Sequence, residues 1–254
     1  AGHPCDWKGL RDLAQKYDVQ LVNDNCHALG ASYFEDKQYA ANYADVVIQS
    51  YHPLKHITTG EGGAILTNNL IIDKKVRSLR SHGMTKDPDQ LENNHGPWYY
   101  EIHELGYNYR ITDFQCALGI SQLKKLDNFV SKRRALSKRY ADSLKDFNNI
   151  TLPHSSNDVE HAFHLYSLKI DFDKNLINKI QFFKNMKNQG ILLQVHYIPV
   201  HIQPYYKRNY GFNEGDYPNA EKFYEQEISL PIFPTLSNDE QNYVIESIKN
   251  NYVK

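Results

Sequence analysis

One lysine, Lys55, lies in the segment Gln49–Gly63, whose sequence QSYHPLKHITTGEGG ends in a glycine-rich turn. A lysine amine becomes a nucleophile when burial or nearby positive charge lowers its pKa, and it then condenses with a carbonyl group to form a Schiff base. Lys55 follows an apolar stretch that predicts a strand, and open α/β sheets place their ligands just past such strand ends. On residue type alone a solvated loop lysine is the commoner case, so the interpretation depends on other residues.

Three polar residues could complete a cofactor site around this lysine. Asp24 ends a second apolar stretch, and an acid there could hold a protonated pyridine nitrogen by a charge-assisted hydrogen bond. Ser50 lies five residues ahead of Lys55, so its hydroxyl could bind a phosphate while the lysine reaches the aldehyde carbon of the same cofactor. His27 follows Asp24 by three residues and could face the cofactor ring. Taken singly, each residue also has a structural interpretation, as a turn aspartate, a strand-end hydroxyl or a packed histidine.

Two other kinds of site are disfavoured by the same segment. His52 and His56 are four residues apart, a spacing that would place both on one face of a helix for zinc binding. Pro53 lies between them, and no carboxylate or cysteine stands at ligand spacing, so we expect no metal site. The GEGG turn lacks the G-x-x-x-x-G-K-[ST] order of a phosphate-binding P-loop.

Strands mixed with helices are predicted for the first part of the chain. Short apolar runs predict buried strands over Val19–Val22, ending at Asp24, and over Val46–Ile48, and GGAILTNN predicts a third strand. Helical periodicity is predicted for residues 6–18 with Asp6 as the N-cap, for residues 70–79, and for residues 112–147, which break into two helices near Asp127. This pattern predicts an α/β layer architecture.

A smaller α+β domain is predicted after residue 150. AFHLYSLKIDF alternates like a strand, NLINKIQFFKNMKNQG reads as a helix that ends at Gly190, and ILLQVHYIP predicts another strand. Ser237 and Glu240 have the spacing of a capping box and predict the start of a final helix. We therefore expect one domain over residues 1–150 and a second over residues 151–254.

The composition excludes several classes of protein. The 254 residues include 29 Lys and Arg against 30 Asp and Glu, spread along the chain, so no electrostatic case for nucleic acid exists. No apolar run reaches the roughly eighteen residues that span a bilayer, and no signal peptide opens the chain. The three cysteines are widely spaced and odd in number, which argues against a disulfide framework. We expect a soluble, cytoplasmic protein.

Three separated motifs resemble one known family. VNDNCHALGASY, SYHPLKHITTGEGGAILTN and ELGYNYRITDFQCALGISQLKKL occur in the order and spacing of the DegT/DnrJ/EryC1/StrS sugar-nucleotide aminotransferases, and the resemblance runs essentially from Ala1 to Lys254. The resemblance implies a pyridoxal 5'-phosphate enzyme of fold type I. Residues 1–150 would then be the C-terminal portion of the large α/β/α domain, and residues 151–254 the small domain.

The resemblance also implies a role for each candidate residue. Lys55 would be the Schiff-base lysine and proton shuttle, Asp24 the partner of the pyridine nitrogen, and Ser50 a phosphate ligand. His27 takes the position of a residue beside the cofactor. Asn108, in GYNYR, would reach the phosphate in the neighbouring subunit's site, so the family's shared active site implies a homodimer.

The implied reaction is a ping-pong transamination from L-glutamate to C4 of a 4-keto sugar nucleotide. LRSHGMTKDP, GPWYYEIHELGYNYR and VHYIPVHIQPYY are similar to family members that act on UDP-linked 4-keto-6-deoxy amino sugars in pseudaminic acid biosynthesis, for surface or flagellin glycans. The resemblance implies that His196, in VHYIP, and Tyr107 would line the sugar-nucleotide pocket. Relatives that dehydrate the sugar carry His at the lysine position, so Lys55 favours transfer.

Two alternatives stay open at the level of the sequence. Tyr197, His201, Tyr205 and Tyr206 fit a substrate pocket as well as a core or an oligomer surface. Full-length family members also carry an upstream segment with early strands and a phosphate-binding cup. The chain could therefore be a fragment of a longer enzyme, half of a split enzyme, or an inactive remnant that only binds a partner.

Overall fold

The structure, a computed structural model, describes residues 1–175 and 177–251 and divides by its contacts into two compact units. The Lys55 unit comprises Cys5–Ser32 and Asp36–Leu126, and the C-terminal unit comprises Ala1–Pro4, Tyr33–Glu35 and Asp127–Lys254. The contacts of the helix that follows Leu126 thus assign it to the C-terminal unit. The domain boundary expected near residue 150 stays a prediction.

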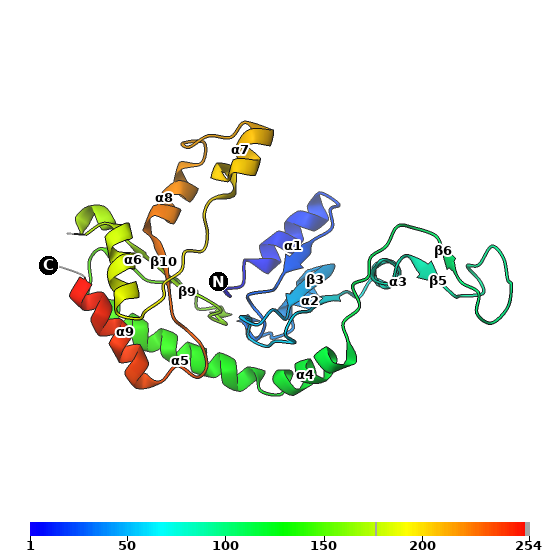
Figure 1. Ribbon diagram of the computed structural model, residues 1–254, viewed down its shortest axis with the longest axis horizontal. Coiled ribbons are helices and arrows are strands. Elements are labelled where there is room, and N and C mark those ends of the chain that lie inside the picture. The colour runs from blue at the N-terminus through cyan, green and yellow to red at the C-terminus, as the bar shows by residue number, and fades with distance from the viewer. Residues whose placement is uncertain (176, 252–254) are drawn as a thin grey trace. The chain divides into compact units, whose positions relative to one another are not determined.

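The Lys55 unit is built on a three-stranded sheet in the order β1-β3-β4 (Figure 1). Its elements are α1 (Trp7–Lys16), β1 (Val22–Asp24), α2 (Tyr39–Tyr43), β3 (Val46–Ser50), β4 (Gly63–Leu66), α3 (Leu70–Arg80), β5 (Met84–Thr85), β6 (Glu101–Ile102) and α4 (Asp113–Leu123). β1 runs parallel to β3, and β4 runs antiparallel to β3. The antiparallel pair β5–β6 and its connecting loop form an arm beyond α3 (Figure 1).

The two faces of this sheet differ in burial. Asn23, Val47 and Gln49 are buried, and they share a face because Asn23 pairs with Val47 and side chains alternate along a strand. Helix α2 packs against β3, and α1 packs against α2. Val22 and Ile48 are exposed to 54% and 37%. The predicted burial of these strands is therefore wrong for one face of the sheet, where the side chains of Val22 and Ile48 are exposed.

Local capping explains where the helices of this unit begin. Asp6 accepts a hydrogen bond from the Gly9 amide at the start of α1, as predicted. Thr112 and Gln115 form a capping box at α4, and α4 ends before α5 begins, which confirms the predicted break near Asp127. The strand expected from Val19 starts later, because the Val19 amide donates to Ala14 O and extends the end of α1.

The C-terminal unit contains an antiparallel sheet in the order β10-β9-β7. Its elements are α5 (Leu126–Leu144), β7 (Ile150–Thr151), β8 (Val159–Glu160), β9 (Tyr166–Ile170), the 3₁₀ turn η1 (Phe172–Lys174), α6 (Lys179–Asn188), the 3₁₀ turn η2 (Val200–Ile202), α7 (Pro204–Tyr210), α8 (Pro218–Gln226), β10 (Glu227–Leu230) and α9 (Asn238–Asn251); the short β2 (Ser32–Tyr33) falls where the units meet in sequence. The predicted strand near residue 166, the helix before Gly190 and the final helix capped by Ser237 and Glu240 are confirmed.

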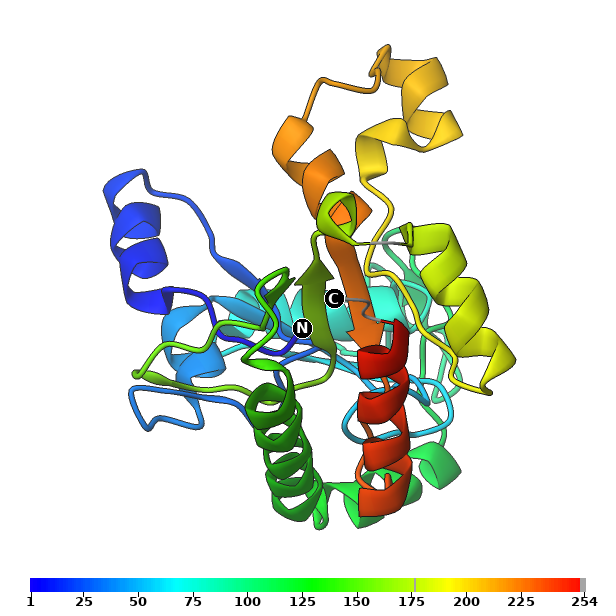
Figure 2. The same ribbon diagram turned by 90° about the vertical axis from the view of Figure 1, so that its left-hand side faces the viewer.

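Helices α5 and α9 lie side by side in this unit (Figure 2, green and red). The Gln241 side chain donates to Leu136 O at 2.7 Å and so links them. Arg133, 4% exposed, donates from one guanidinium nitrogen to the carbonyls of Phe163, His164 and Ile232 at 2.9 to 3.2 Å. Burial lowers the pKa of Arg133 to about 10. A buried cation with three acceptors thus ties α5 to distant loops.

The strand predicted for ILLQVHYIP is wrong. This segment makes only an isolated bridge between Gln194 and Ser229 and carries no strand. The reason lies in its hydrogen bonds, because the His196 amide donates to the carboxylate of Glu227 and not to a neighbouring strand's carbonyl. A side chain thus replaces the ladder that a strand would need.

Candidate active site

Asp24 and Ser50 lie at one edge of the Lys55 unit's sheet. β1 and β3 are parallel with Asp24 opposite Ile48, so both strands end toward the same side, and Ser50 is the last residue of β3. Asp24 is exposed, and Ser50 and Lys55 are half-buried. The carboxyl ends of neighbouring parallel strands are where α/β proteins bind ligands. An acid and a hydroxyl thus end two neighbouring parallel strands at the same edge of the sheet.

Backbone hydrogen bonds hold the loop that carries Lys55. The Lys55 amide donates to His52 O at 2.9 Å, and the Thr59 amide donates to Tyr51 O at 3.0 Å. The Tyr51 amide donates to Gly62 O at 2.8 Å, which ties the loop to the start of β4. The lysine thus projects from a tightly bonded turn, because both ends of the turn bond to the same short stretch of backbone.

The charges around Asp24 show which residues the fold brings together. Hydrogen bonding to Cys26 is the largest cause that lowers the pKa of Asp24, burial opposes it, and the positive charges of His27 and Lys55 lower the pKa further. The Cys26 amide donates to Asp24 Oδ1 at 3.1 Å. Burial, together with Asp24, raises the pKa of the Cys26 thiol to about 11. Asp24 therefore stays ionised next to His27 and Lys55, while Cys26 stays a neutral thiol.

Asn108 and Tyr107 lie on another segment of the Lys55 unit. Asn108 is exposed and forms a bridge with Ser81, just after α3. The Tyr107 amide donates to Leu79 O at 2.7 Å, and the Tyr107 ring stacks on Tyr109 at 4.7 Å between centroids. The structure thus groups Asn108 with the end of α3 and not with the Asp24 edge.

A groove of about 770 Å³ follows the open side of β3 and β4. Ile48 and Ile65 form one wall, and Tyr107 lies on another. The groove also contains basic residues that the sequence interpretation missed, namely Arg77, Arg80 and Arg110. Their spacing in α3 and in NYR offered the signal, because Arg77 and Arg80 lie three residues apart on one helix face. Arg77 also pairs with Asp73 at 2.9 Å, so part of its charge is compensated.

His196 belongs to the C-terminal unit, unlike the other candidate residues. Its Nδ1 lies 2.8 Å from Ser229 Oγ, and its amide donates to Glu227 Oε2 at 2.8 Å. The Tyr197 ring packs edge-on against the His196 ring at 4.6 Å between centroids. The half-buried His196 ring is thus held by polar contacts on one side and by an aromatic ring on another.

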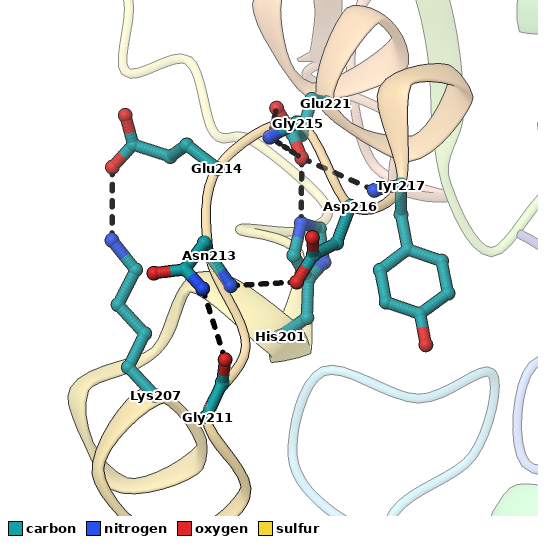
Figure 3. Close-up of polar contacts among 9 residues, drawn as sticks. All are labelled: His201, Lys207, Gly211, Asn213, Glu214, Gly215, Asp216, Tyr217 and Glu221. Atoms are coloured by element: carbon teal, nitrogen blue, oxygen red, sulfur yellow. Dashed lines mark hydrogen bonds and ion pairs between the residues drawn. The ribbon is translucent and has the colours of Figure 1, made fainter.

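The aromatic cluster left open by the sequence separates into buried and exposed members. His201 is buried, and its Nε2 donates to Glu221 Oε1 at 2.8 Å, whereas Tyr197 and Tyr205 are exposed to 62% and 58%. Glu221 also accepts the amides of Gly215 and Tyr217 and so closes the loop between α7 and α8 (Figure 3). The hydrogen bond from His201 lowers the pKa of Glu221. His201 is therefore a structural residue of this loop.

The described residues offer neither a metal-binding cluster nor a helix that could cross a membrane. Within residues 1–175 and 177–251, no group of three or more His, Cys, Asp or Glu side chains is arranged to hold a metal ion. Over the same part of the chain, no helix has both the length and the apolar character that crossing a bilayer requires.

Comparisons with known proteins identify relatives along nearly the whole chain. The sequence model of the DegT/DnrJ/EryC1/StrS aminotransferase family matches residues 1–249. A protein from Methanocaldococcus jannaschii, MJ1066, is 40% identical over 249 residues, which cover 98% of this chain and 64% of that protein. The UDP-4-amino-4,6-dideoxy-N-acetyl-beta-L-altrosamine transaminase of Campylobacter jejuni subsp. jejuni serotype O:23/36 is 34% identical over 258 residues, 99% of this chain and 65% of that enzyme.

Solved structures agree with the sequence relatives. PseC of Helicobacter pylori, an aminotransferase of pseudaminic acid biosynthesis, matches with a TM-score of 0.86 and 29% identity, over 98% of this chain and 64% of that one. The likeness confirms the predicted α/β fold of fold type I. The chain spans about two thirds of the length of the curated relatives that it matches.

Proposed function

The chain belongs to the DegT/DnrJ/EryC1/StrS aminotransferase family, and on that premise we propose that it acts as a pyridoxal 5'-phosphate-dependent sugar-nucleotide aminotransferase. The observation that carries the proposal is the grouping of Asp24, Ser50 and Lys55 around one edge of the sheet, with Asp24 kept ionised. The amino donor would be L-glutamate, and the acceptor would be C4 of a UDP-linked 4-keto-6-deoxy amino sugar.

The residues present fit the cofactor. Asp24, whose pKa is lowered, supplies a carboxylate that can hold a protonated pyridine nitrogen by a charge-assisted hydrogen bond. Ser50 Oγ can donate to the phosphate, and Lys55 Nζ can bond to the aldehyde carbon. His27, whose charge acts on Asp24, would lie beside the ring. When bound, the cofactor withdraws electrons from the substrate carbon and carries the amino group between the two substrates.

The protein's own part in the reaction is to orient the ring and to move one proton. Lys55 Nζ would take the proton from Cα of the amino donor. It would then deliver that proton to C4′, the carbon that carried the aldehyde of the cofactor. Asp24 would keep the ring nitrogen protonated throughout, because its carboxylate stays charged at neutral pH. The bonded turn around Lys55 would limit how far Nζ strays between the two carbons.

The sugar specificity and the assembly are the finer parts of the proposal. The names of the Campylobacter jejuni and Helicobacter pylori relatives support a substrate of pseudaminic acid biosynthesis, used for surface or flagellin glycans. Tyr107 and His196 would contact the sugar nucleotide. Asn108 would reach a phosphate in a second copy of the chain, so we propose a homodimer. The three free cysteines support a reducing, cytoplasmic location.

The test begins with the cofactor and Lys55. Mixing the chain with pyridoxal 5'-phosphate is expected to give a visible absorption band, and borohydride reduction followed by peptide mapping is expected to find the cofactor on Lys55. Lys55→Ala should lose the band, whereas Lys86→Ala, an exposed lysine in a loop of the same unit, should keep it. Modification of another lysine, or no band at all, would refute the proposal and favour a non-catalytic chain that binds a partner.

The donor can then be tested on the cofactor-loaded protein. L-Glutamate is expected to bleach the visible band and to release 2-oxoglutarate in equal amount, while L-alanine at the same concentration leaves the band in place. A band that L-alanine bleaches as fast as L-glutamate would contradict glutamate as the donor without touching the role of Lys55.

A further inference from the structure

Glu227 is a fully buried carboxylate in the sheet of the C-terminal unit. It accepts three hydrogen bonds, from Ser167 Oγ at 2.8 Å, from Ser229 Oγ at 2.7 Å and from the His196 amide at 2.8 Å. Ser167 and Ser229 face each other across β9 and β10, so the two hydroxyls reach the same oxygen, Oε1. A buried charge is stable only when its oxygens are satisfied, and these three donors satisfy both.

The same hydroxyl connects Glu227 to the His196 ring. Ser229 Oγ lies 2.7 Å from Glu227 Oε1 and 2.8 Å from His196 Nδ1. A hydroxyl has one proton, and a carboxylate oxygen can only accept, so the Ser229 proton points to Glu227. Ser229 Oγ must then accept from His196, which requires the proton of the neutral ring to sit on Nδ1. The other ring nitrogen, Nε2, is left as an acceptor.

We propose that Glu227 is a positioning residue that acts through Ser229 to fix the tautomer of His196. This proposal rests on the proposed function, in which His196 belongs to the sugar-nucleotide pocket. The fixed tautomer would make Nε2 the accepting nitrogen of the neutral ring. It would also favour protonation of Nε2, because the buried carboxylate stabilises the imidazolium through the intervening hydroxyl.

Other charged groups face the same carboxylate. Lys179 on α6 has a pKa lowered by burial, which the charge of Glu227 opposes, and it donates to Tyr224 O. Burial is the main cause that raises the pKa of Tyr197, and Glu227 raises it further. Lys179 therefore shares the environment of Glu227, and a variant that removes the carboxylate changes both groups. The measurement that decides must report on the His196 ring itself.

The Glu227→Gln variant is expected to change the position of the His196 ring proton, an effect that a purely structural role of Glu227 would not produce. The His196 amide still needs an acceptor, so the Gln carbonyl oxygen is held there and the amide NH₂ faces the two serine hydroxyls. Ser229 Oγ then accepts from the Gln NH₂ and must donate its own proton to His196 Nδ1. The ring proton is expected to move from Nδ1 to Nε2.

The tautomer can be read by NMR on the whole chain labelled with ¹⁵N-histidine, at a pH where the ring is neutral. Protonated and unprotonated ring nitrogens have well-separated ¹⁵N resonances, and the signal lost in His196→Gln assigns the ring. We expect the Nδ1–H form in the unmodified chain, the Nε2–H form in Glu227→Gln and a mixture in Ser229→Ala. Ser167→Ala is the control, because Ser167 donates to the same carboxylate but is not part of the Glu227–Ser229–His196 series of hydrogen bonds. This variant should retain the Nδ1–H form.

An Nε2–H form in the unmodified chain, or an Nδ1–H form that survives in both Glu227→Gln and Ser229→Ala, would overturn the proposal. Because the readout needs no activity, it remains decisive if the transaminase assay fails. If that assay succeeds, Glu227→Gln should lower kcat/KM on the order of tenfold, as expected for one well-placed hydrogen bond, and Ser167→Ala should not. Should Glu227→Gln fail to fold, Ser229→Ala decides the tautomer.

Discussion

The C-terminal unit contains a large cluster of buried apolar side chains, whereas fewer apolar side chains of the Lys55 unit are fully buried. Tyr140, Ile170 and Phe182 of the C-terminal unit are fully buried in one cluster between its sheet and helices. In the Lys55 unit, Phe114 is exposed to 90% and Ile71 to 80%. Exposed apolar surface of this kind is typical of interaction sites. The C-terminal unit is therefore built around a buried apolar core, whereas the Lys55 unit exposes apolar surface of the kind that other proteins can cover.

The candidate chemistry is also divided unequally between the units. Asp24, Ser50 and Lys55 lie in the Lys55 unit, and their own side chains are exposed or half-buried. His196 and Glu227 stand in the C-terminal unit, within a satisfied hydrogen-bond network. Changes in the Lys55 unit should therefore affect activity or association more than stability. Changes in the C-terminal unit should do the reverse.

The largest effect is expected for Lys55→Ala. Removing a group that moves a proton in the reaction should lower the transamination rate by roughly 10²- to 10⁴-fold or more. The melting temperature should change little, because Lys55 is half-buried and lies in a turn held by backbone bonds. Rate measurements with L-glutamate and a thermal melt check both parts. A large fall in melting temperature would contradict the assignment of this lysine to chemistry, and Lys86→Ala supplies the control.

Arg133→Ala should have the largest effect on stability. The change leaves three carbonyls without their buried donor, and we expect a loss of about 3 kcal/mol in the free energy of unfolding. Both tryptophans, Trp7 and Trp98, lie in the Lys55 unit. Urea unfolding followed by far-UV circular dichroism should therefore shift more than the same titration followed by tryptophan fluorescence.

A control for this change lies six residues further along α5. Arg139 bonds to Asn238 and Asn242 at a more exposed site, so Arg139→Ala should cost less than about 1 kcal/mol. Equal shifts of both signals in Arg133→Ala would show that the units unfold together, and the contrast between them would then fail.

Phe114→Asp tests whether the exposed apolar surface of the Lys55 unit is used for association. The side chain is in the first turn of α4, where an acidic residue is compatible with the helix. We expect self-association to weaken by about tenfold, as for an apolar interface residue, with no loss of stability. Analytical ultracentrifugation measures the change. Ile180→Asp, at an 81% exposed position of the C-terminal unit, is the matched control and should leave association unchanged.

The smallest effect is expected at Glu221, between α7 and α8. Its pKa is lowered in the folded chain by His201 and by the amides it accepts, so its contribution is present above the ordinary pKa of 4.5 and is lost as the pH falls through the folded value. Protection factors for amide exchange of residues 211–217, which correct for the slower intrinsic exchange in acid, should therefore fall as the pH is lowered. Glu221→Gln should show faster exchange at neutral pH already, and unchanged exchange in that variant would count against the role of this carboxylate.

Local signals in the sequence correctly predicted the starts of α1, α4 and α9. Asp6, the pair Thr112 and Gln115, and the pair Ser237 and Glu240 act on amides within three residues, so their meaning depends on no distant part of the chain. The α/β class and the family follow from patterns and motifs of the same local kind. The roles of Asp24, Ser50 and Lys55 stay predictions, although the parallel pairing of β1 and β3 gives Asp24 and Ser50 a common edge.

The helix caps, the strand ends that carry the polar residues and the motifs of the family can all be recognised in the sequence. Which charged residues are buried depends on the tertiary structure. Arg133 reads as a surface residue of an amphipathic helix until the fold brings it to Ile232, 99 residues away. Glu227 likewise turns the predicted strand around His196 into an irregular segment, because its carboxylate accepts the amide that a ladder would have used. Hydrogen bonds of this range depend on packing, and no local pattern encodes them.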